Sequence, residues 1–255
     1  MKWDPQQTIE ILKEYVYSKN RIDEYRNRVA LSNLQLPPFY VKENNNQSMS
    51  SVVVRFINEK EIKKTYDKET YQWIVTSLEE TILNSLKMAE NIVGIHRHED
   101  IYLALYEDDG DLDYLIEIAN YINTTVKIID YTLYEKYQTV KEVKEVKVGI
   151  GIANDPSEEK IYDLEDSFLV PFDDGTKDSV QLAEMYAAEV IIFNNLPVCT
   201  DAWVFVNLND ENQELIRKNS RQYFNTKMPH QRLFTDLVDP KIGLEIEQGT
   251  LQVSE

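Results

Sequence analysis

The sequence predicts an α+β fold in which one mixed sheet carries helices on one face. A β-branched run at residues 52–57 favours a strand. Two apolar runs between residues 91 and 106, joined by a polar turn, favour a hairpin. An apolar stripe with helical spacing follows over residues 112–133, and then an apolar strand over 146–153. Because a helix also separates the first strand from the hairpin, this order predicts a palm-like or ferredoxin-like sheet.

The helix after the first strand has a recognisable start. Asp67 is a suitable N-cap, and apolar residues recur at helical spacing from Tyr71 to Leu86. Further along the chain the sequence predicts an acidic loop, an Ala-rich helix, a strand and a short helix, at residues 154–177, 179–194, 198–206 and 210–217.

Composition also predicts the domain boundaries. Asp4-Pro5 pairs a capping acid with a proline at the first helical position, so residues 1–42 are predicted to form an N-terminal helical arm. The polar stretch 43–51 is predicted to be a linker, and the α+β domain to span residues 52–220. In the tail, 221–255, alternation around Gln248-Gly249 favours a terminal hairpin.

The net charge of −18 and the single cysteine limit the classes of protein to which the chain could belong. A hydrophobic content of 42% is typical of a folded chain. An acidic surface repels phosphate backbones, so no direct nucleic-acid contact is expected. The sequence has no long apolar run and no apolar N-terminal signal. We therefore expect a cytoplasmic protein that makes no contact with a membrane. Cys199 alone can form no internal disulfide.

The turn of the hairpin holds the residues that are predicted to carry chemistry. Palm-type nucleotidyl enzymes hold two divalent ions between a carboxylate on the first strand and one in the hairpin turn. Asp100 and Glu99 occupy the turn position and are the candidate metal ligands, with Asp100 as the candidate catalytic residue. Mg²⁺ or Mn²⁺ would be the ion. The first strand offers Arg55 in place of an acid, with Asn58 and the acids Glu59 and Glu61 after it.

Two histidines beside this turn allow another interpretation. His96 and His98 are two residues apart on a predicted strand, so with Asp100 they make a ligand set suited to zinc or iron. The alternative is a half-buried His96 and a solvated His98, which need no metal. The glycines of Gly149-Ile-Gly151 lie inside an apolar strand and favour close backbone approach rather than phosphate binding.

Three motifs in this order resemble a class III nucleotide cyclase domain. Glu99-Asp-Ile-Tyr-Leu-Ala-Leu-Tyr106 is similar to the family's hairpin, with Asp100 at the metal position. Val148-Gly-Ile-Gly-Ile152 is similar to a later strand, and residues 175–185 are similar to the last catalytic helix. The arm beginning at Trp3 is similar to that of small bacterial cyclases, including the pyrimidine cyclases of Pycsar anti-phage systems. The resemblance covers roughly residues 3–220.

The sequence departs from the family at the positions that carry its catalysis. Phe56 stands at the position of the family's first metal-binding Asp. The family has a glycine on each side of the hairpin Asp, and neither glycine is present beside Asp100. The catalytic Asn becomes Gln181 and the catalytic Arg becomes Met185. The resemblance implies a nucleoside triphosphate ligand and a head-to-tail homodimer, whereas the departures imply a degenerate domain with little electrostatic catalysis.

Three functions remain open at this level. The first is a non-catalytic cyclase-like protein that binds a nucleotide or has a regulatory or interaction role. The second is an active metal-dependent nucleotidyl cyclase that makes a cyclic nucleotide signal, as in anti-phage defence, with Asp100 and Glu99 at a rearranged metal site. The third is an acidic module that captures a basic protein partner. The position of the first strand relative to Asp100 distinguishes them, because a nearby Arg55 would neutralise Asp100 and displace a metal.

Overall fold

The computed structural model describes seven segments of the chain, residues 49–98, 100–107, 110–139, 142–155, 179–190, 196–219 and 232–252. The predicted arm at 1–42 and almost all of the predicted acidic loop at 154–177 lie outside these residues. Within them the elements follow in the order β1 (Met49–Phe56), α3 (Glu59–Thr65), α4 (Lys68–Leu86), β2 (Ile92–His98), β3 (Ile101–Glu107), α5 (Asp113–Tyr137), β4 (Val148–Asp155), α6 (Ser179–Glu189), β5 (Val198–Asp201), α7 (Ala202–Val206), α8 (Asp210–Asn219), β6 (Arg232–Thr235) and α9 (Pro240–Glu247). None of the described helices is both long and apolar enough to cross a membrane.

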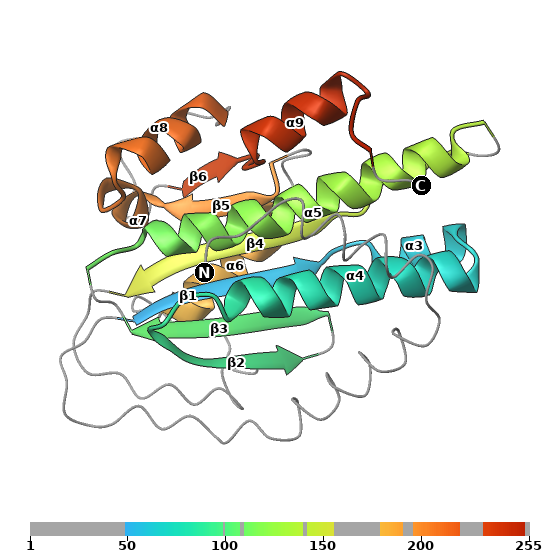
Figure 1. The fold of residues 1–255 in the computed structure, drawn as a ribbon. Coiled ribbons are helices and arrows are strands. Elements are labelled where there is room, and N and C mark those ends of the chain that lie inside the picture. The colour runs from blue at the N-terminus through green and yellow to red at the C-terminus, as the bar shows by residue number, and fades with distance from the viewer. Residues whose placement is uncertain are drawn as a thin grey trace.

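The described strands form one mixed sheet with the order β2-β3-β1-β4-β5-β6 (Figure 1). Strand β1 lies at its centre and pairs antiparallel with both β3 and β4. Strand β5 runs parallel to β4, and helix α6 makes the crossover between them. The predicted α+β class and mixed palm-like sheet are therefore confirmed. Strand β1 begins at Met49, so the last residues of the range predicted as a linker belong to the sheet.

The prediction of helices on one face holds for α4 and α5 but not for α6. Even-numbered residues of β1, including Val52 and Val54, pack into a core with α4 and α5. Val53 belongs instead to a second core with residues of α6, such as Ala183 and Tyr186. Figure 1 shows α4 and α5 in front of the sheet and α6 behind it. The sheet is thus covered on both faces, because its strands are apolar on both sides.

Helix α4 begins where the sequence predicts. The Asp67 carboxylate accepts a hydrogen bond from the backbone N–H of Thr70 at 2.9 Å. This bond, and then those from the Thr70 and Tyr137 hydroxyls, lower the pKa of Asp67 to about 2. The predicted stripe faces the core, since Ile74, Leu78, Ile82 and Leu86 are fully buried. The capping residue and the apolar spacing together determine where the helix begins and which side of it packs.

The glycines of β4 allow helix α6 to lie directly on the strand. A Cβ atom added to Gly151 would stand 1.8 Å from the backbone oxygen of Ala183. One added to Gly149 would stand 2.1 Å from the backbone oxygen of Ala187. Real Cβ atoms do not approach backbone so closely, so any side chain at either position would push α6 away. The predicted role of these glycines is confirmed.

The C-terminal part of the chain departs from two predictions. The strand predicted at 198–206 ends at Asp201 and continues as helix α7. Val204 is buried and Val206 is 60% exposed, so residues two apart do not share a face as they would in a strand. The predicted terminal hairpin is also wrong, because residues 240–247 form helix α9.

The start and end of α9 explain why no hairpin forms. The Asp239 side chain accepts from the backbone N–H groups of Lys241 and Ile242, and Pro240 stands in the first turn. Gly249, with φ at 64°, follows the C-cap in the left-handed conformation that often terminates helices. The alternation of Leu244 and Ile246 is also compatible with a helix, and the capping signals decide between the two.

Candidate functional site at the hairpin tip

The tip of the β2–β3 hairpin lies beside the end of the first strand. The backbone N–H of Phe56 donates to the carbonyl oxygen of Asp100 at 3.0 Å, and Arg55 pairs in register with Ile101. The chain thus brings Asp100 to the strand end where a palm-type site needs a carboxylate. The end of the first strand and Asp100 are therefore adjacent, and this is the position on which the choice among the three functions depends.

A guanidinium group, rather than a second carboxylate, meets Asp100 at this position. The Nε atom of Arg55 lies 3.5 Å from Oδ2 of Asp100. Arg55 alternates with Val54, which packs against α4 and α5, so its side chain stands on the face that carries α6. The side chains are 36% and 28% exposed, respectively. A guanidinium cation therefore stands beside the Asp100 carboxylate.

The other predicted oxygen donors are bound elsewhere. The Asn58 amide donates through Nδ2 to the carbonyl oxygen of Glu145 and accepts through Oδ1 from the N–H of Lys147, each at 2.9 Å. The Glu59 carboxylate accepts a hydrogen bond from the Tyr71 hydroxyl. The amide of Asn58 thus joins the start of α3 to the segment before β4. It is structurally engaged and does not converge with Asp100.

Among the described residues, no second oxygen ligand converges with Asp100 at this tip. Phe56, at the position of the family's first metal ligand, has a buried side chain in the core with α4 and α5. Across the described segments, no three or more His, Cys, Asp or Glu side chains lie close enough to hold a metal ion. Glu99 and the side chain of His98 lie outside the described residues. Two sets of metal ligands were predicted, Glu99 with Asp100, and His96 with His98 and Asp100. In each set at least one side chain lies outside the described residues, so its position relative to Asp100 is not described.

Helix α6 contains Gln181 and Met185, the positions that correspond to catalytic residues in the class III cyclases that the sequence resembles. Met185 packs partly buried against the apolar core between α6 and the sheet. The side chain of Gln181 lies outside the described residues. The thioether of Met185 brings no positive charge, so the described part of α6 supplies no cation that could stabilise a transferring phosphoryl group.

A second carboxylate with unusual surroundings was not predicted from the sequence. Asp130, on α5, accepts a hydrogen bond from the N–H of Val146 at 2.7 Å. Burial, together with the nearby charge of Glu145, raises the pKa of Asp130 to about 8, although the Val146 bond and Lys127 act in the opposite direction. In the sequence Asp130 is one polar residue in a helical stripe, and no neighbouring motif distinguishes it.

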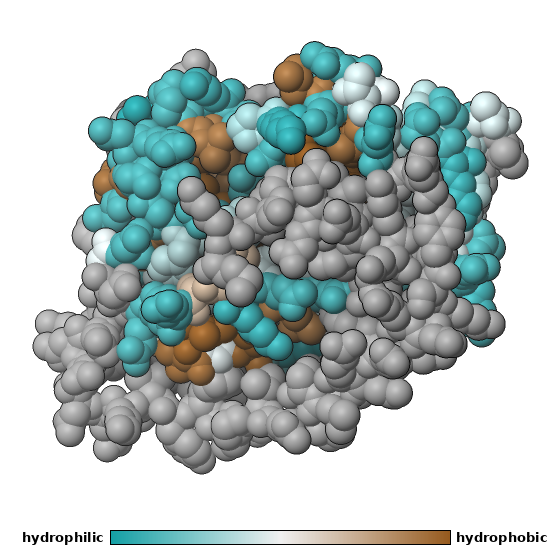
Figure 2. Space-filling model, in the orientation of Figure 1, coloured by the Kyte–Doolittle hydropathy of each residue, from teal (hydrophilic) through white to brown (hydrophobic). Residues whose placement is uncertain are grey.

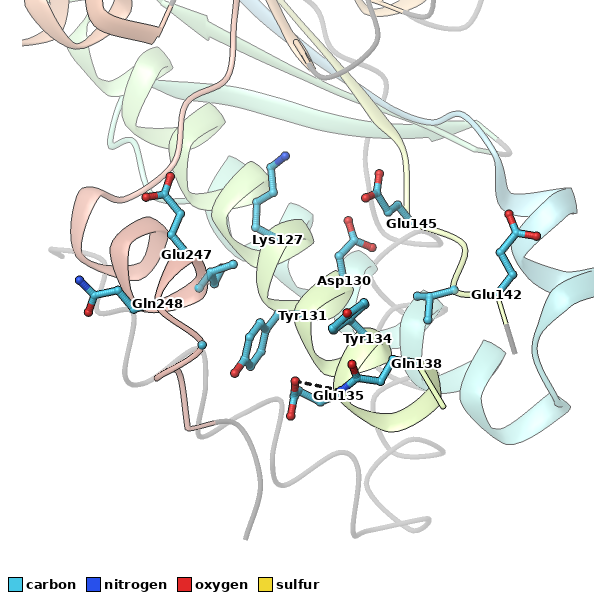
Figure 3. A pocket seen from close by; sticks show the side chains of 13 residues that line it. Lys127, Asp130, Tyr131, Tyr134, Glu135, Gln138, Glu142, Glu145, Glu247 and Gln248 are labelled. Carbon is cyan, nitrogen blue, oxygen red and sulfur yellow. Dashed lines mark hydrogen bonds between the residues drawn. The ribbon is translucent and has the colours of Figure 1, made fainter. Parts of the chain in front are cut away.

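Asp130 lines a cleft of about 850 Å³ between α5, the segment before β4 and α9 (Figure 3). Figure 2 shows a largely hydrophilic surface over the described C-terminal helices, with hydrophobic spots. Leu244 on α9, which is 52% exposed, is one of the hydrophobic side chains that reach solvent.

Comparison with known proteins identifies the fold through structure alone. No family model and no curated protein sequence matches the chain. A bacterial light-regulated adenylyl cyclase superposes with a TM-score of 0.50 and 12% identity, over 100% of this chain and 72% of that one. The guanylyl cyclase Cya2 gives 0.46 and 10%, over 76% and 93%. The adenylyl cyclase CyaB from P. aeruginosa gives 0.44 and 9%, over 74% and 93%.

Identities this low relate the folds and not the activities. The hairpin whose turn holds Asp100 and the glycine strand under α6 are two of the motifs on which the predicted resemblance was based, and both are present in the fold. The chain has the palm fold of the class III nucleotide cyclases.

Proposed function

We propose that the protein is a non-catalytic, cyclase-like protein that binds a nucleotide or acts as a regulatory or interaction partner. The observation that carries the proposal is the Arg55–Asp100 ion pair, with 3.5 Å between Nε and Oδ2. Arg55 places a positive charge beside Asp100, as a metal ion would. Its guanidinium cannot coordinate a phosphate in the way that a metal ion does. A fixed guanidinium can hold a phosphate, but it cannot generate the two-metal arrangement that palm-type catalysis uses.

The groups around the ion pair support the same proposal. A two-metal site needs carboxylates that converge on one point, whereas Phe56 is buried away from Asp100 and Asn58 is bound to the backbone of Glu145 and Lys147. On α6, Met185 stands where the resembling family has its catalytic arginine. Loss of both the metal carboxylate and the cation removes the main sources of electrostatic stabilisation.

The resemblance supports further parts of the proposal. The ligand is a nucleoside triphosphate, because the hairpin and the glycine strand are similar to those of nucleotide cyclases. The assembly is a homodimer, since that family builds its sites between two copies. The protein acts in the cytoplasm, in an anti-phage defence context of the Pycsar type. Size-exclusion chromatography with light scattering tests the dimer, and a monomer at all concentrations would contradict it.

Product analysis tests the absence of catalysis. The full chain is incubated with Mg²⁺ or Mn²⁺ and each nucleoside triphosphate, and we expect no cyclic nucleotide by mass spectrometry. A cyclic product that Asp100→Ala abolishes would overturn the proposal and establish the active cyclase instead.

Metal binding tests the role of Arg55 directly. Titration calorimetry with Mn²⁺ should show no binding at the hairpin tip of the wild type. The Arg55→Ala variant exposes the Asp100 carboxylate and should gain weak Mn²⁺ binding, which Asp100→Asn in the same background should remove. Lys87→Ala, a loss of one exposed cation outside the tip, is the matched control. Equal Mn²⁺ binding by the wild type and Arg55→Ala would show that Arg55 does not replace the metal.

An active metal-dependent cyclase is the second candidate, and the looseness of the ion pair favours it. The 3.5 Å separation and the partial exposure of both side chains mean that a metal–nucleotide complex has to displace only a weak contact. This candidate predicts turnover by the wild type and faster turnover by Arg55→Ala. Inactivity of both proteins would exclude it.

A further inference from the structure

Two threonines of the C-terminal strands have buried hydroxyls without a hydrogen-bond partner. Thr200 on β5 and Thr235 on β6 are both 0% exposed. Among the described residues, neither Oγ1 atom has a donor or an acceptor within hydrogen-bond distance. A hydroxyl that gives up its bonds to solvent water and gains none in return is costly, so buried hydroxyls in folded proteins are usually satisfied. The pair therefore points to a hydrogen-bonding molecule inside the fold.

The two hydroxyls stand on the same face of the sheet and on neighbouring strands. Strands β5 and β6 pair antiparallel, with Thr200 opposite Leu233 and Thr235 opposite Val198. Val198 and Leu233 belong to the core on the side of α5, and each threonine is two residues away from one of them on its own strand, so both threonines share that face. Diagonal neighbours of a ladder are roughly 7 Å apart, a separation that one small molecule can bridge.

The sheet around the two hydroxyls offers them no partner. Thr200 has Ile152 beside it on β4 and Leu233 beside it on β6, and Thr235 has Val198 beside it on β5. These neighbouring side chains are all apolar. The backbone of β5 pairs with β4 on one side and with β6 on the other. A threonine on a strand also lacks the carbonyl oxygen four residues back that a helical hydroxyl can use.

Polar side chains of α5 already meet this part of the chain. The Asn123 amide donates to Oδ1 of Asp236 and to the carbonyl oxygen of Leu237, each at 2.7 Å. The Thr124 hydroxyl accepts from the backbone N–H of Asp239 at 2.8 Å. The contact between α5 and the segment after β6 is therefore polar in part, and water is buried in proteins at polar contacts of this kind.

We propose that one internal water molecule bridges Thr200 and Thr235 on the face of the sheet that carries α5. Each hydroxyl is neutral and can both donate and accept, as water can. The water accepts from one hydroxyl and donates to the other, and it stays in place until β6 separates from β5. Neither residue belongs to the hairpin tip, so the inference does not rest on the function proposed there.

Valine substitutions test the bridge, because valine has nearly the shape of threonine without its hydroxyl. In Thr200→Val or Thr235→Val the water loses one partner, and the remaining hydroxyl stays buried. We expect each single change to raise the equilibrium constant of unfolding about tenfold, as removal of one partner from a buried hydrogen bond does. The double variant leaves no hydroxyl to satisfy, so its constant should return to within about threefold of the wild type. Urea denaturation of the full chain measures all four constants.

Thr125 on α5 provides the matched control. Its hydroxyl is also buried and has no partner among the described residues. Successive residues of a helix are turned by about 100°. Thr125 therefore points away from the side of α5 on which Asn123 and Thr124 hold the C-terminal segment. The effects of Thr125→Val and Thr200→Val on the unfolding constant should add to within about twofold.

Magnetic relaxation dispersion of water oxygen-17 counts long-lived internal waters directly. The double variant should hold one fewer than the wild type. Equal numbers in the two proteins would overturn the proposal. Additive effects of Thr200→Val and Thr235→Val on the unfolding constant, of either sign, would overturn it as well, because hydroxyls that share no water are independent of each other.

Discussion

The two faces of the central sheet are packed by different means. On the face of α4 and α5, branched side chains such as Val52, Val54 and Ile150 form a thick apolar layer between helix and strand. On the opposite face, Gly149 and Gly151 bring β4 into direct contact with the backbone of α6. A side-chain layer can adjust to a substitution by changing rotamers, whereas a backbone contact cannot. The α6 face is therefore the less tolerant of the two.

An aspartate carboxylate has different surroundings on the two sides of the sheet. Asp100 lies at the strand ends on the α6 side and has Arg55 as a counter-ion. Asp130 lies on α5, on the other side of the sheet, and has only a backbone N–H and the charge of Lys127 to offset its burial. Asp100 thus has a charged side-chain partner, whereas burial raises the pKa of Asp130 and only a backbone N–H and the charge of Lys127 act against that rise.

The largest effect should follow from filling the backbone contact. Gly151→Ala places a Cβ 1.8 Å from the oxygen of Ala183, so α6 must move off β4. We expect the free energy of unfolding to fall by about 3 kcal/mol or more, at the upper end for overpacked cores. Urea denaturation followed by circular dichroism measures it.

Gly243→Ala is the matched control for this change. Its Cβ would meet Cγ1 of Val238 at 3.6 Å, an ordinary contact, and it stands within helix α9. It should leave stability unchanged or raise it by up to about 1 kcal/mol, because alanine favours helix. Equal destabilisation by the two substitutions would contradict the difference between the faces.

A smaller effect should follow from the Asp130 carboxyl on the other face, whose pKa is raised. The folded-state pKa of Asp130, about 8, is above its ordinary value of 3.8. The folded chain therefore holds a proton that the unfolded chain has lost, and stability contributed by this group decreases as pH rises from about 4 to about 8. Asp130→Asn keeps an acceptor for Val146 without a charge. The full rise of the pKa from 3.8 to about 8 corresponds to about 5 kcal/mol at pH 8. Because part of the Asp130 side chain is exposed, we expect the variant to be at least about 2 kcal/mol more stable than the wild type there and nearly equal at pH 4.

Thermal denaturation of both proteins across this pH range checks the expectation. Asp67 provides the internal contrast, because its pKa is lowered to about 2 and its contribution is lost as pH falls toward that value. Parallel pH profiles of the wild type and Asp130→Asn would show that burial of Asp130 does not affect stability.

The smallest effect should follow from breaking the ion pair at the hairpin tip. Arg55 and Asp100 are both partly exposed and only loosely paired, so Arg55→Ala should change stability by less than about 0.5 kcal/mol. Chemical denaturation in low and high salt measures this contribution. A loss above about 1 kcal/mol would mean that the pair has a structural role and is not simply a replacement for a metal.

Local signals in the sequence predict the central elements well. The Asp67 cap and the stripe that follows it predict α4, and the glycines of β4 indicate the close approach of another backbone. The hairpin is also where its two apolar runs place it. These features depend on neighbouring residues, so a single sequence contains them.

Two of the missed features, strand β6 and the raised pKa of Asp130, depend on residues far apart in the chain. Strand β6 is paired only through its register with β5, and no local pattern identified it. The cap at Asp239-Pro240 is the same signal that predicts a helix at Asp4-Pro5, and it could have found α9. Asp130 acquires its high pKa from Glu145 and from burial, both of which require the folded chain. Covering of both sheet faces, in contrast, has a local signal, because successive residues of β1 and β3 are apolar.

Strand β6 also has a consequence for the solubility of shortened chains. It lies at the end of the sheet order and pairs with β5 from Arg232 to Thr235, so β6, and not β5, is the edge strand on that side of the described sheet. A chain cut before Arg232 would present the backbone donors and acceptors of β5 to any other strand, together with the apolar surface that Leu233 and Phe234 cover. Residues 232–235 thus keep this apolar surface from other molecules and leave a strand of only four residues as the edge on that side.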